Sequence, residues 1–369
     1  MTTATLQQTP FHDFHIQHGA KLVDYTGWEM PLLYGSIIEE HKQVRESGGV
    51  FDVSHMGRLR FKGRDAALFL DTVCTRAIAS MKEGQVRYTL VCNASGGCRD
   101  DVLIYCMDSA EYLMVCNAAN RQKLVEHFEA TKGEMVFSMK DETLKTAMLA
   151  VQGPKVMEMI SDFSQSIPDL KRYRFIEKSI LMVAKIQVSR TGYTGEDGVE
   201  IILPAKLAGQ AMNMLGLKGD LEETPIRPCG LGARDSLRME AGMPLYGHEI
   251  DEETDPLTVG LGFAVKLDKE TPFIGQEALQ AIDAAGPQRR LVGLFLEGRR
   301  AARQGMPVLL GENVIGSVTS GCLSPTLDRS IAMAIIDADH SDISTTLAVD
   351  LGRQRAEAAV TALPFLKKP

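Results

Sequence analysis

Several features that would narrow the class of this 369-residue chain are missing from it. Its seven cysteines form no CxxC pair, which indicates neither a structural zinc site nor a disulfide framework. No GxGxxG or GxxxxGK[ST] follows a predicted strand, so a phosphate-cradling loop is disfavoured. No apolar run approaches the ~20 residues of a membrane span, and the N-terminus lacks the charged and apolar segments of an export signal.

These absences limit the cellular compartments and the classes of partner that we expect for the protein. We expect a protein that is neither exported nor membrane-spanning, cytoplasmic, or in the mitochondrial matrix if the chain is a mature eukaryotic form. Its formal charge of −8 argues against a general nucleic-acid partner. Apolar residues make up 44% and charged residues 24% of the chain, as in ordinary soluble proteins. The length predicts two or three domains.

The stretch 93–105, NASGGCRDDVLIY, combines a glycine turn, two adjacent carboxylates and a strand. Gly96 and Gly97 offer the positive φ angles of a tight reversal, and the flanking residues have the composition of hairpin arms. Successive strand side chains point to opposite faces, so one of Asp100 and Asp101 should point inward. A carboxylate there is paired, protonated or used, because an unpaired buried charge is costly. A capping and salt-bridged pair and a functional carboxylate both fit this pattern.

The pattern of elements predicts a mixed α+β protein with a separate C-terminal part. An amphipathic helix at 36–47 ends at Gly48-Gly49. A strand, a helix from Asp65, the hairpin, the strand 112–116, the helix 119–130 and the strand 134–139 then follow in the order of a split βαβ sandwich. Further strands are predicted at 180–188 and 199–203. From Pro287, six short strands between turns predict a small barrel or sandwich, over 291–296, 307–310, 314–319, 331–336, 346–349 and 356–361.

Three polar segments are candidates for function. The connector 190–198, RTGYTGEDG, carries three glycines that would let the backbone approach a flat ligand closely. In a predicted helix over 230–242, Arg234 and Arg238 share a face, which fits an anion site or an internal salt-bridge network. His12, His15 and His18 recur at spacing three, but the third leaves the helical face of the first, which disfavours metal binding there.

Long motifs of the chain resemble the T protein of the glycine cleavage system, an aminomethyltransferase that uses tetrahydrofolate. The resemblance covers nearly the whole chain. It is carried by GAKLVDYTGWEMPL near the start and by FDVSHM, NASGGCRDD, VQGP, SRTGYTGEDGVE, GLGARDSLRMEAGMPLYG and TSGCLSPTL. One departure is the end of the chain, PFLKKP, where family members often carry a tyrosine soon after the PF segment.

The resemblance implies a multidomain fold with mixed α/β folate-binding domains, one of them ferredoxin-like, and a C-terminal β-barrel. The expected boundaries are 1–56 with 144–246 for a discontinuous folate-site domain, 57–143 with 247–286 for the ferredoxin-like domain, and 287–369 for the barrel.

It also implies a site. Asp101 would lie by the reactive nitrogens of the folate as the catalytic carboxylate. Glu200 would grip the pterin, whose 2-amino and N3–H groups form a donor pair that one carboxylate can accept. Arg234 would be a polar anchor, and the pocket walls would be Tyr193, Tyr173, Tyr88, Asn117 and Met56. No metal is expected, and no cysteine is placed by a motif to serve as a nucleophile.

The implied reaction moves the methylene carbon of an aminomethyl group on a lipoylated carrier (H) protein to tetrahydrofolate and releases ammonia. Alternatives of the same fold are a folate-dependent demethylase and a non-catalytic folate-binding accessory protein. The accessory proteins carry KGCYxGQE where this chain has RTGYTGEDG. Family carriers are generally acidic, so five arginines, at 289, 290, 299, 300 and 303, are the predicted docking patch. A solvated basic edge without a partner is the alternative interpretation.

Overall fold

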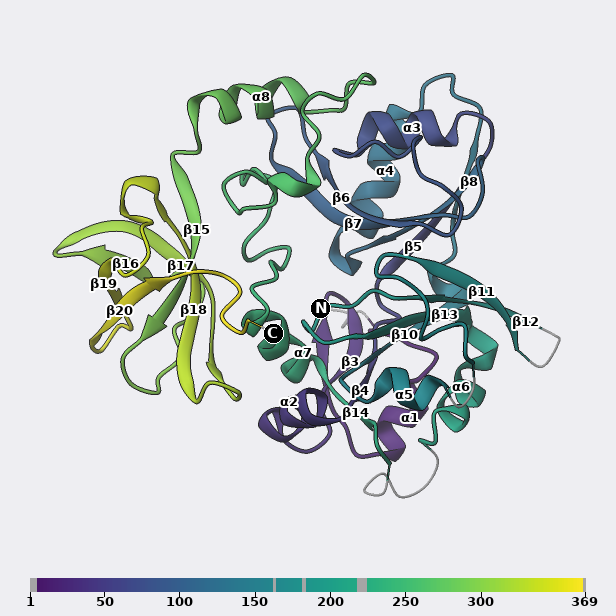
Figure 1. The fold of residues 1–369 in the computed structure, drawn as a ribbon, viewed down its shortest axis with the longest axis horizontal. Coiled ribbons are helices and arrows are strands. Elements are labelled where there is room, and N and C mark those ends of the chain that lie inside the picture. Colours follow the sequence, from purple (N-terminus) through teal and green to yellow (C-terminus); the bar gives the residue numbers. More distant parts are fainter. Residues whose placement is uncertain (1–4, 162–163, 181–183, 218–223, 368–369) are drawn as a thin grey trace. The chain divides into compact units, whose positions relative to one another are not determined.

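The computed structural model describes residues 5–161, 164–180, 184–217 and 224–367. Figure 1 labels the elements and colours them along the sequence. The chain divides into two compact units. The first unit comprises Met1–Ala66, Met81–Arg87 and Leu103–Asp235. The second comprises Ala67–Ser80, Tyr88–Val102 and Ser236–Pro369. Each unit is therefore built from segments that are far apart in the sequence.

A six-stranded sheet with the order β11-β12-β13-β10-β4-β14 is the main sheet of the first unit. Its central strands are antiparallel. Their apolar side chains pack with those of helices α5 (Val156–Ser161) and α6 (Ala208–Met214) to form one core. The strands are β4 (Gly49–Asp52), β10 (Thr146–Gln152), β11 (Phe175–Ile180), β12 (Ala184–Ser189), β13 (Gly198–Pro204) and β14 (Arg227–Pro228). The strand predicted over 180–188 is only partly right: β12 covers 184–188 of it, residues 181–183 lie outside the described residues, and Ile180 is the last residue of β11, which pairs antiparallel with β12.

The N-terminal segment adds a three-stranded sheet, β1-β3-β2, to the first unit. Its strands are β1 (Gln7–Gln8), β2 (Lys21–Tyr25) and β3 (Trp28–Leu33). The described residues of this unit also form five complete α-helices and the first half of α7 (Leu231–Glu240). The complete helices are α1 (His12–Gln17), α2 (Ile37–Glu46), α4 (Arg121–Thr131), α5 (Val156–Ser161) and α6 (Ala208–Met214). Helix α2 confirms the helix predicted over 36–47: the Ser36 side chain accepts from the Glu39 N–H at its start, as an N-cap does.

A five-stranded sheet has the order β6-β7-β8-β5-β9. Its elements are β5 (Gly57–Lys62), α3 (Ala66–Val73), β6 (Val86–Cys92), β7 (Cys98–Cys106), β8 (Glu111–Cys116), α4 and β9 (Ser138–Asp141). Strand β5 lies between β8 and β9, antiparallel to both, which confirms the predicted split βαβ arrangement. The last strand was predicted too early, over 134–139. Residues 134–137 are not strand, because the backbone of Val136 is bonded to Asp65 instead.

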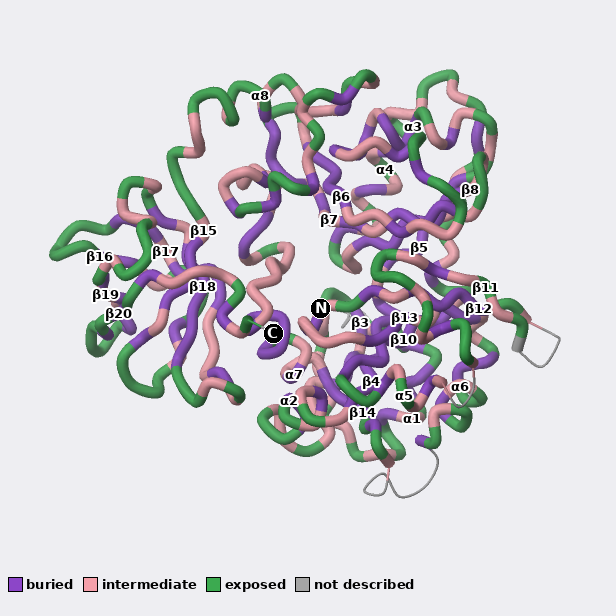
Figure 2. The backbone as a smooth tube through the Cα atoms, in the orientation of Figure 1, coloured by how far each residue is buried: buried purple, intermediate pink, exposed green. Residues whose placement is uncertain are grey.

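The C-terminal part is a closed barrel with the strand order β15-β18-β17-β16-β19-β20. It confirms all six predicted strands and decides between barrel and sandwich, because β20 pairs with β15 to close the sheet. The strands are β15 (Arg289–Leu296), β16 (Pro307–Leu310), β17 (Asn313–Ser324), β18 (Arg329–Asp337), β19 (Thr346–Asp350) and β20 (Arg355–Thr361). Figure 2 shows their buried positions alternating with exposed ends and turns.

The remaining helices of the second unit are α8 (Gln276–Ala285) and the short 3-10 turns η4 (Gly262–Ala264) and η5 (Ala338–His340). The C-terminal tail packs inside this unit. Phe365 is 9% exposed in a cluster with Met239 and Met333, and the N–H of Leu366 donates to the Glu240 carbonyl. None of the helices in the described ranges has the length and apolar character needed to cross a bilayer.

Candidate functional site

The hairpin turn between β6 and β7 is closed by the side chain of Asn93, whose Oδ1 accepts from the backbone N–H groups of Ser95 and Gly97. Gly96 has φ +89°, as predicted. Gly97 does not need a positive φ. A Cβ on it would lie 1.9 Å from the carbonyl oxygen of Glu252, so glycine is required there for space. The prediction for these two glycines was therefore right in residue type and wrong in cause for the second.

The two aspartates of β7 lie on opposite faces of the strand, as the alternation rule requires. Asp100 is fully buried, while Asp101 is half-buried. The hydroxyl of Tyr88, on β6, donates to Asp101 Oδ2 over 3.1 Å. Asp101 is thus the carboxylate of the pair that keeps access to solvent, with a hydrogen bond from the Tyr88 hydroxyl that orients it.

The glycine-rich connector 190–198 folds over the fully buried side chain of Gln152. The Gln152 Nε2 donates to the carbonyls of Thr191 and Val199, and its Oε1 accepts from the Thr194 hydroxyl. A Cβ on Gly192 would lie 1.9 Å from Gln152 Oε1, and one on Gly198 would lie 2.9 Å from Nε2. Gly192 therefore leaves room for the Gln152 side chain, and Gly198, where a Cβ would lie 2.2 Å from the Val151 carbonyl oxygen, leaves room for the neighbouring strand. That the connector lets its backbone approach a flat ligand stays a prediction.

Glu200 follows this connector on β13 and is 6% exposed. Burial raises the pKa of its carboxyl group, while a hydrogen bond from the Thr191 hydroxyl and the charge of Arg234 act in the opposite direction. Thr191 was not predicted as a site residue, although it lies in the connector 190–198. The result is a carboxylate that is held in place and largely stripped of water.

Arg234, in the first turn of α7, places its guanidinium 4.7 Å from the centre of the Tyr193 ring. Its Nη1 is buried and has no hydrogen-bond partner among the described residues. A cationic donor without a partner is costly in a protein interior, so this atom is suited to a ligand acceptor. Arg238, one turn on, is instead paired with buried Glu249 over 2.8 Å. The anion-site interpretation thus fits Arg234 and the salt-bridge interpretation fits Arg238.

The loop between β4 and β5 carries half-buried Met56 next to buried His55. Arg58, which is fully buried, shapes this loop by donating to the carbonyls of Met56 and Ser54 and to Thr143. Burial lowers the pKa of His55 to about 3, although the charge of Asp52 acts against this shift. Sequence reasoning missed Arg58, since an arginine that alternates with apolar strand residues looks solvent-exposed.

Two further predicted wall residues lie on loops of the first unit. Tyr173 is 50% exposed and has φ 57°, a left-handed conformation that is rare for a residue with a large side chain. Its backbone is fixed there, because its N–H donates to Arg190 and its carbonyl accepts from Val86. Asn117 directly follows β8 and is half-buried. Strained, exposed aromatics of this kind cluster at ligand sites.

The predicted site residues thus fall into two sets. Tyr88 and Asp101 belong to the second unit and are hydrogen-bonded to each other. The other six belong to the first unit, where Arg234 contacts Tyr193 and acts on the pKa of Glu200. They are Met56, Asn117, Tyr173, Tyr193, Glu200 and Arg234.

The described residues contain no group of three or more side chains that could hold a metal ion. The histidines of the N-terminal helix have carboxylate or aromatic neighbours instead. His12 contacts Glu29 over 2.7 Å, and His15 joins Asp52 at 2.9 Å to the Tyr34 hydroxyl at 2.7 Å.

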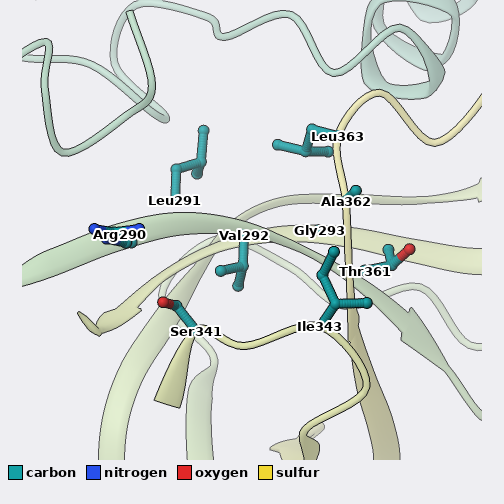
Figure 3. A pocket seen from close by; sticks show the side chains of 9 residues that line it. All are labelled: Arg290, Leu291, Val292, Gly293, Ser341, Ile343, Thr361, Ala362 and Leu363. Atoms are coloured by element: carbon teal, nitrogen blue, oxygen red, sulfur yellow. The ribbon is translucent and has the colours of Figure 1, made fainter. Parts of the chain in front are cut away.

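A small pocket on the barrel contains none of the predicted site residues (Figure 3). It is lined mainly by apolar side chains, with Arg290 at its edge, and the lining is Arg290, Leu291, Val292, Gly293, Ser341, Ile343, Thr361, Ala362 and Leu363.

The predicted docking patch is divided by strand β15. Arg289 and Arg290 begin the strand, and the other three arginines follow its end, which is about 20 Å away at the rise of a strand. The register agrees, since Arg289 is opposite Asp337 at the end of β18, while the Arg300 carbonyl accepts from Ser330 near its start. Five arginines that are close in sequence are therefore two separate groups.

Comparisons with known proteins agree with the architecture. The model for the GCVT N-terminal domain matches residues 11–269, and that for the glycine cleavage T-protein C-terminal barrel domain matches residues 289–367. An aminomethyltransferase of Symbiobacterium thermophilum is 42% identical, over 99% of this chain and 98% of that protein. One from Rubrobacter xylanophilus is 44% identical, over 99% and 95%. The crystal structure of glycine cleavage system aminomethyltransferase T from Bartonella henselae superposes with a TM-score of 0.90 at 31% identity, covering 98% of each chain.

Proposed function

This chain belongs to the glycine cleavage T-protein family, and we propose that it is the tetrahydrofolate-dependent aminomethyltransferase of a glycine cleavage system. It would transfer the methylene carbon of a lipoyl-bound aminomethyl group to tetrahydrofolate, with release of ammonia. The observation that carries this proposal is the match to curated aminomethyltransferases along nearly the full length of both chains.

Glu200 is the proposed anchor of the pterin. Its burial supports this role, because a carboxylate with little water around it gains most from a ligand that brings two donors. Arg234 and Tyr193 support the same pocket, since the first offers an unpartnered donor and the second an aromatic face. Met56, Asn117 and Tyr173 are the remaining proposed walls on this unit.

Asp101 is the proposed catalytic carboxylate. The transferred carbon becomes cationic when ammonia leaves, and a fixed negative charge lowers the energy of such a species. The Tyr88 hydroxyl supports the role by orienting the carboxylate without neutralising it. The same carboxylate can take a proton from the attacking folate nitrogen. The methylene carbon exchanges its bonds to the amino nitrogen and to the lipoyl sulfur for bonds to two folate nitrogens, and the two protons that these nitrogens lose end on the departing ammonia and on the lipoyl thiol. This chemistry calls for neither a metal nor a covalent protein nucleophile.

The proposed partner is a lipoylated carrier protein with an acidic surface. Arg300 and Arg303 are the best candidates for contact with it. Both side chains are exposed, and among the described residues neither arginine forms an ion pair. Arg299 contributes less free charge, since it is paired with Asp328 over 2.9 Å. The pair Arg289 and Arg290 lies at the other end of β15 and is left out of this patch.

The deciding experiment measures ammonia released from an aminomethylated lipoyl carrier with and without tetrahydrofolate. Rapid release that needs tetrahydrofolate is the expected result. Turnover of small methylated amines in its place would identify the demethylase alternative. Folate binding without any turnover would identify the accessory-protein alternative.

A further inference from the structure

Phe263 is a large apolar residue that the folding of its unit leaves 69% exposed. It lies on the short turn η4, in the second unit. One side of its ring is covered by Tyr88, with ring centroids 6.0 Å apart and planes inclined by 21°. Single exposed apolar residues need no explanation in general, but this one stacks on the tyrosine whose hydroxyl contacts Asp101.

The turn that carries Phe263 is attached firmly to the strand that carries Tyr88. The hydroxyl of buried Thr75 donates to the carbonyl of Ala264 over 2.7 Å and accepts from the N–H of Leu90 over 3.1 Å. The hydroxyl of Thr89 lies 3.1 Å from the same atom. One side chain therefore connects the residue after Phe263 to two residues that follow Tyr88. Thr75 therefore fixes the backbone segments that carry the two rings relative to each other.

We propose that Phe263 is a positioning residue: its ring holds Tyr88 in the orientation that keeps the phenol hydroxyl on Asp101 Oδ2. This inference rests on the proposed role of Asp101. Offset-stacked rings restrict each other, and a half-exposed tyrosine without such a neighbour has other staggered rotamers available to it. Removal of the Phe263 ring would let the Tyr88 hydroxyl move away from Asp101 Oδ2 for part of the time.

If Phe263 acts only through Tyr88, the kinetics of the single and double variants should follow a specific pattern. Phe263→Ala should lower kcat by about three- to tenfold, and Tyr88→Phe by about tenfold, the worth of one hydrogen bond to a charged group. The double variant should be no slower than Tyr88→Phe alone, because once the hydroxyl is gone its orientation does not matter. The KM values for tetrahydrofolate and for the carrier should change by less than about twofold. Phe263→Tyr, which keeps the ring, should retain wild-type kcat.

The measurement is steady-state ammonia release with the full chain and an aminomethylated lipoyl carrier. Val314→Ala is the matched control, because Val314 is 66% exposed on the barrel and far along the chain from both rings. Additive losses in the double variant, or a change confined to KM, would overturn the inference by showing that Phe263 meets a ligand itself. Wild-type turnover in Phe263→Ala would also overturn it.

A failure of the proposed function gives a different result. If Asp101→Asn keeps wild-type turnover in the same assay, the assignment of the catalytic carboxylate is wrong. If Asp101→Asn is inactive while Tyr88→Phe is unaffected, Asp101 stands and only the role of Phe263 falls.

Discussion

The two proposed functional carboxylates are held in opposite ways. Glu200 is 6% exposed, and the connector that precedes it is wrapped over a buried glutamine side chain. Asp101 is half-buried on a hairpin and takes its hydrogen bond from a half-buried tyrosine. Burial raises the pKa of Glu200, whereas Asp101 keeps access to solvent and is oriented by the Tyr88 hydroxyl.

The difference matches two tasks. A binding carboxylate benefits from lost hydration, since ligand donors then replace no water. A carboxylate that must meet a developing positive charge has to be ionised already, and a fixed donor keeps it oriented without removing its charge. In the free protein, burial of the Glu200 carboxylate is energetically unfavourable. Donors from a bound ligand would remove that cost.

The largest effect is expected at the second carboxylate. Asp101→Asn keeps the shape and removes the charge, so turnover should fall by about 10² or more while folding stays normal. Single-turnover ammonia release measures the loss, and thermal unfolding checks the fold.

Asp100→Asn is its neighbouring control. Asp100 is fully buried, so this change should act on stability more than on turnover. An inactive but stable Asp100→Asn, together with an active Asp101→Asn, would reverse the assignment of the two faces of β7.

Glu200→Gln should weaken tetrahydrofolate binding more than it lowers turnover at saturation. An amide cannot accept with both ends, so one pterin donor would face another donor, at a cost of about 1 to 3 kcal/mol. Calorimetric titration with tetrahydrofolate gives the dissociation constant, and an unchanged value would remove Glu200 as the anchor.

The same variant should not lose stability at neutral pH. A carboxyl group with a raised folded-state pKa contributes stability below its unfolded pKa and loses it as pH rises through the folded value. Above the folded-state pKa the ionised group is therefore a cost that Gln does not carry. Trp28, the one tryptophan of the chain, is buried in the first unit, so its fluorescence follows unfolding of the unit that contains Glu200.

The pH dependence of stability tests whether His55, like Glu200, is a buried titratable group of the first unit. Its folded-state pKa of about 3 lies below the ordinary value of 6.5, so the unfolded chain binds a proton that the folded one refuses. Stability should fall as pH drops below about 6.5, by about 2 kcal/mol between pH 7 and pH 5. Urea unfolding followed by Trp28 fluorescence measures this.

His55→Asn should remove that part of the pH dependence. His340, a partly exposed histidine on turn η5 of the barrel, gives the matched control, and His340→Asn should leave the dependence as in the wild type. Equal slopes for wild type and His55→Asn would show that His55 is not buried in its neutral form.

The sequence predicted more about elements than about the causes of particular residues. Periodicity and turn residues located the barrel strands and the split βαβ order because both depend on local patterns. The role of Gly97 depends on the carbonyl of Glu252, and that of Gly192 on the side chain of Gln152. These contacts join distant segments, and no local pattern encodes them.

The sequence likewise predicted some features of the site and missed others. Alternation along β7 separates Asp100 from Asp101, but the hydroxyl that bonds Asp101 comes from the other arm of the hairpin. The resemblance named Glu200 and Arg234, whereas Thr191 and Arg58 emerged only from the folded chain. Spacing in sequence also united arginines that β15 separates.

That separation gives the smallest and most selective prediction. If Arg300 and Arg303 contact an acidic carrier, Arg300→Ser with Arg303→Ser should raise the apparent KM for the carrier by about two- to fivefold, mainly by slowing association. Wild-type turnover at low carrier should fall with added salt, as screening requires. Binding of free tetrahydrofolate should not change.

Arg289→Ser with Arg290→Ser is the matched control, because it removes the same charge from the other end of β15. Equal effects of the two double variants would mean that net charge, and not this surface, governs the encounter, and salt-insensitive kinetics would exclude electrostatic steering altogether. A raised KM in the first double variant alone would assign carrier docking to the loop between β15 and β16. Because rim charges change association more than the stability of the complex, the dissociation rate of the carrier should be nearly the same in both variants.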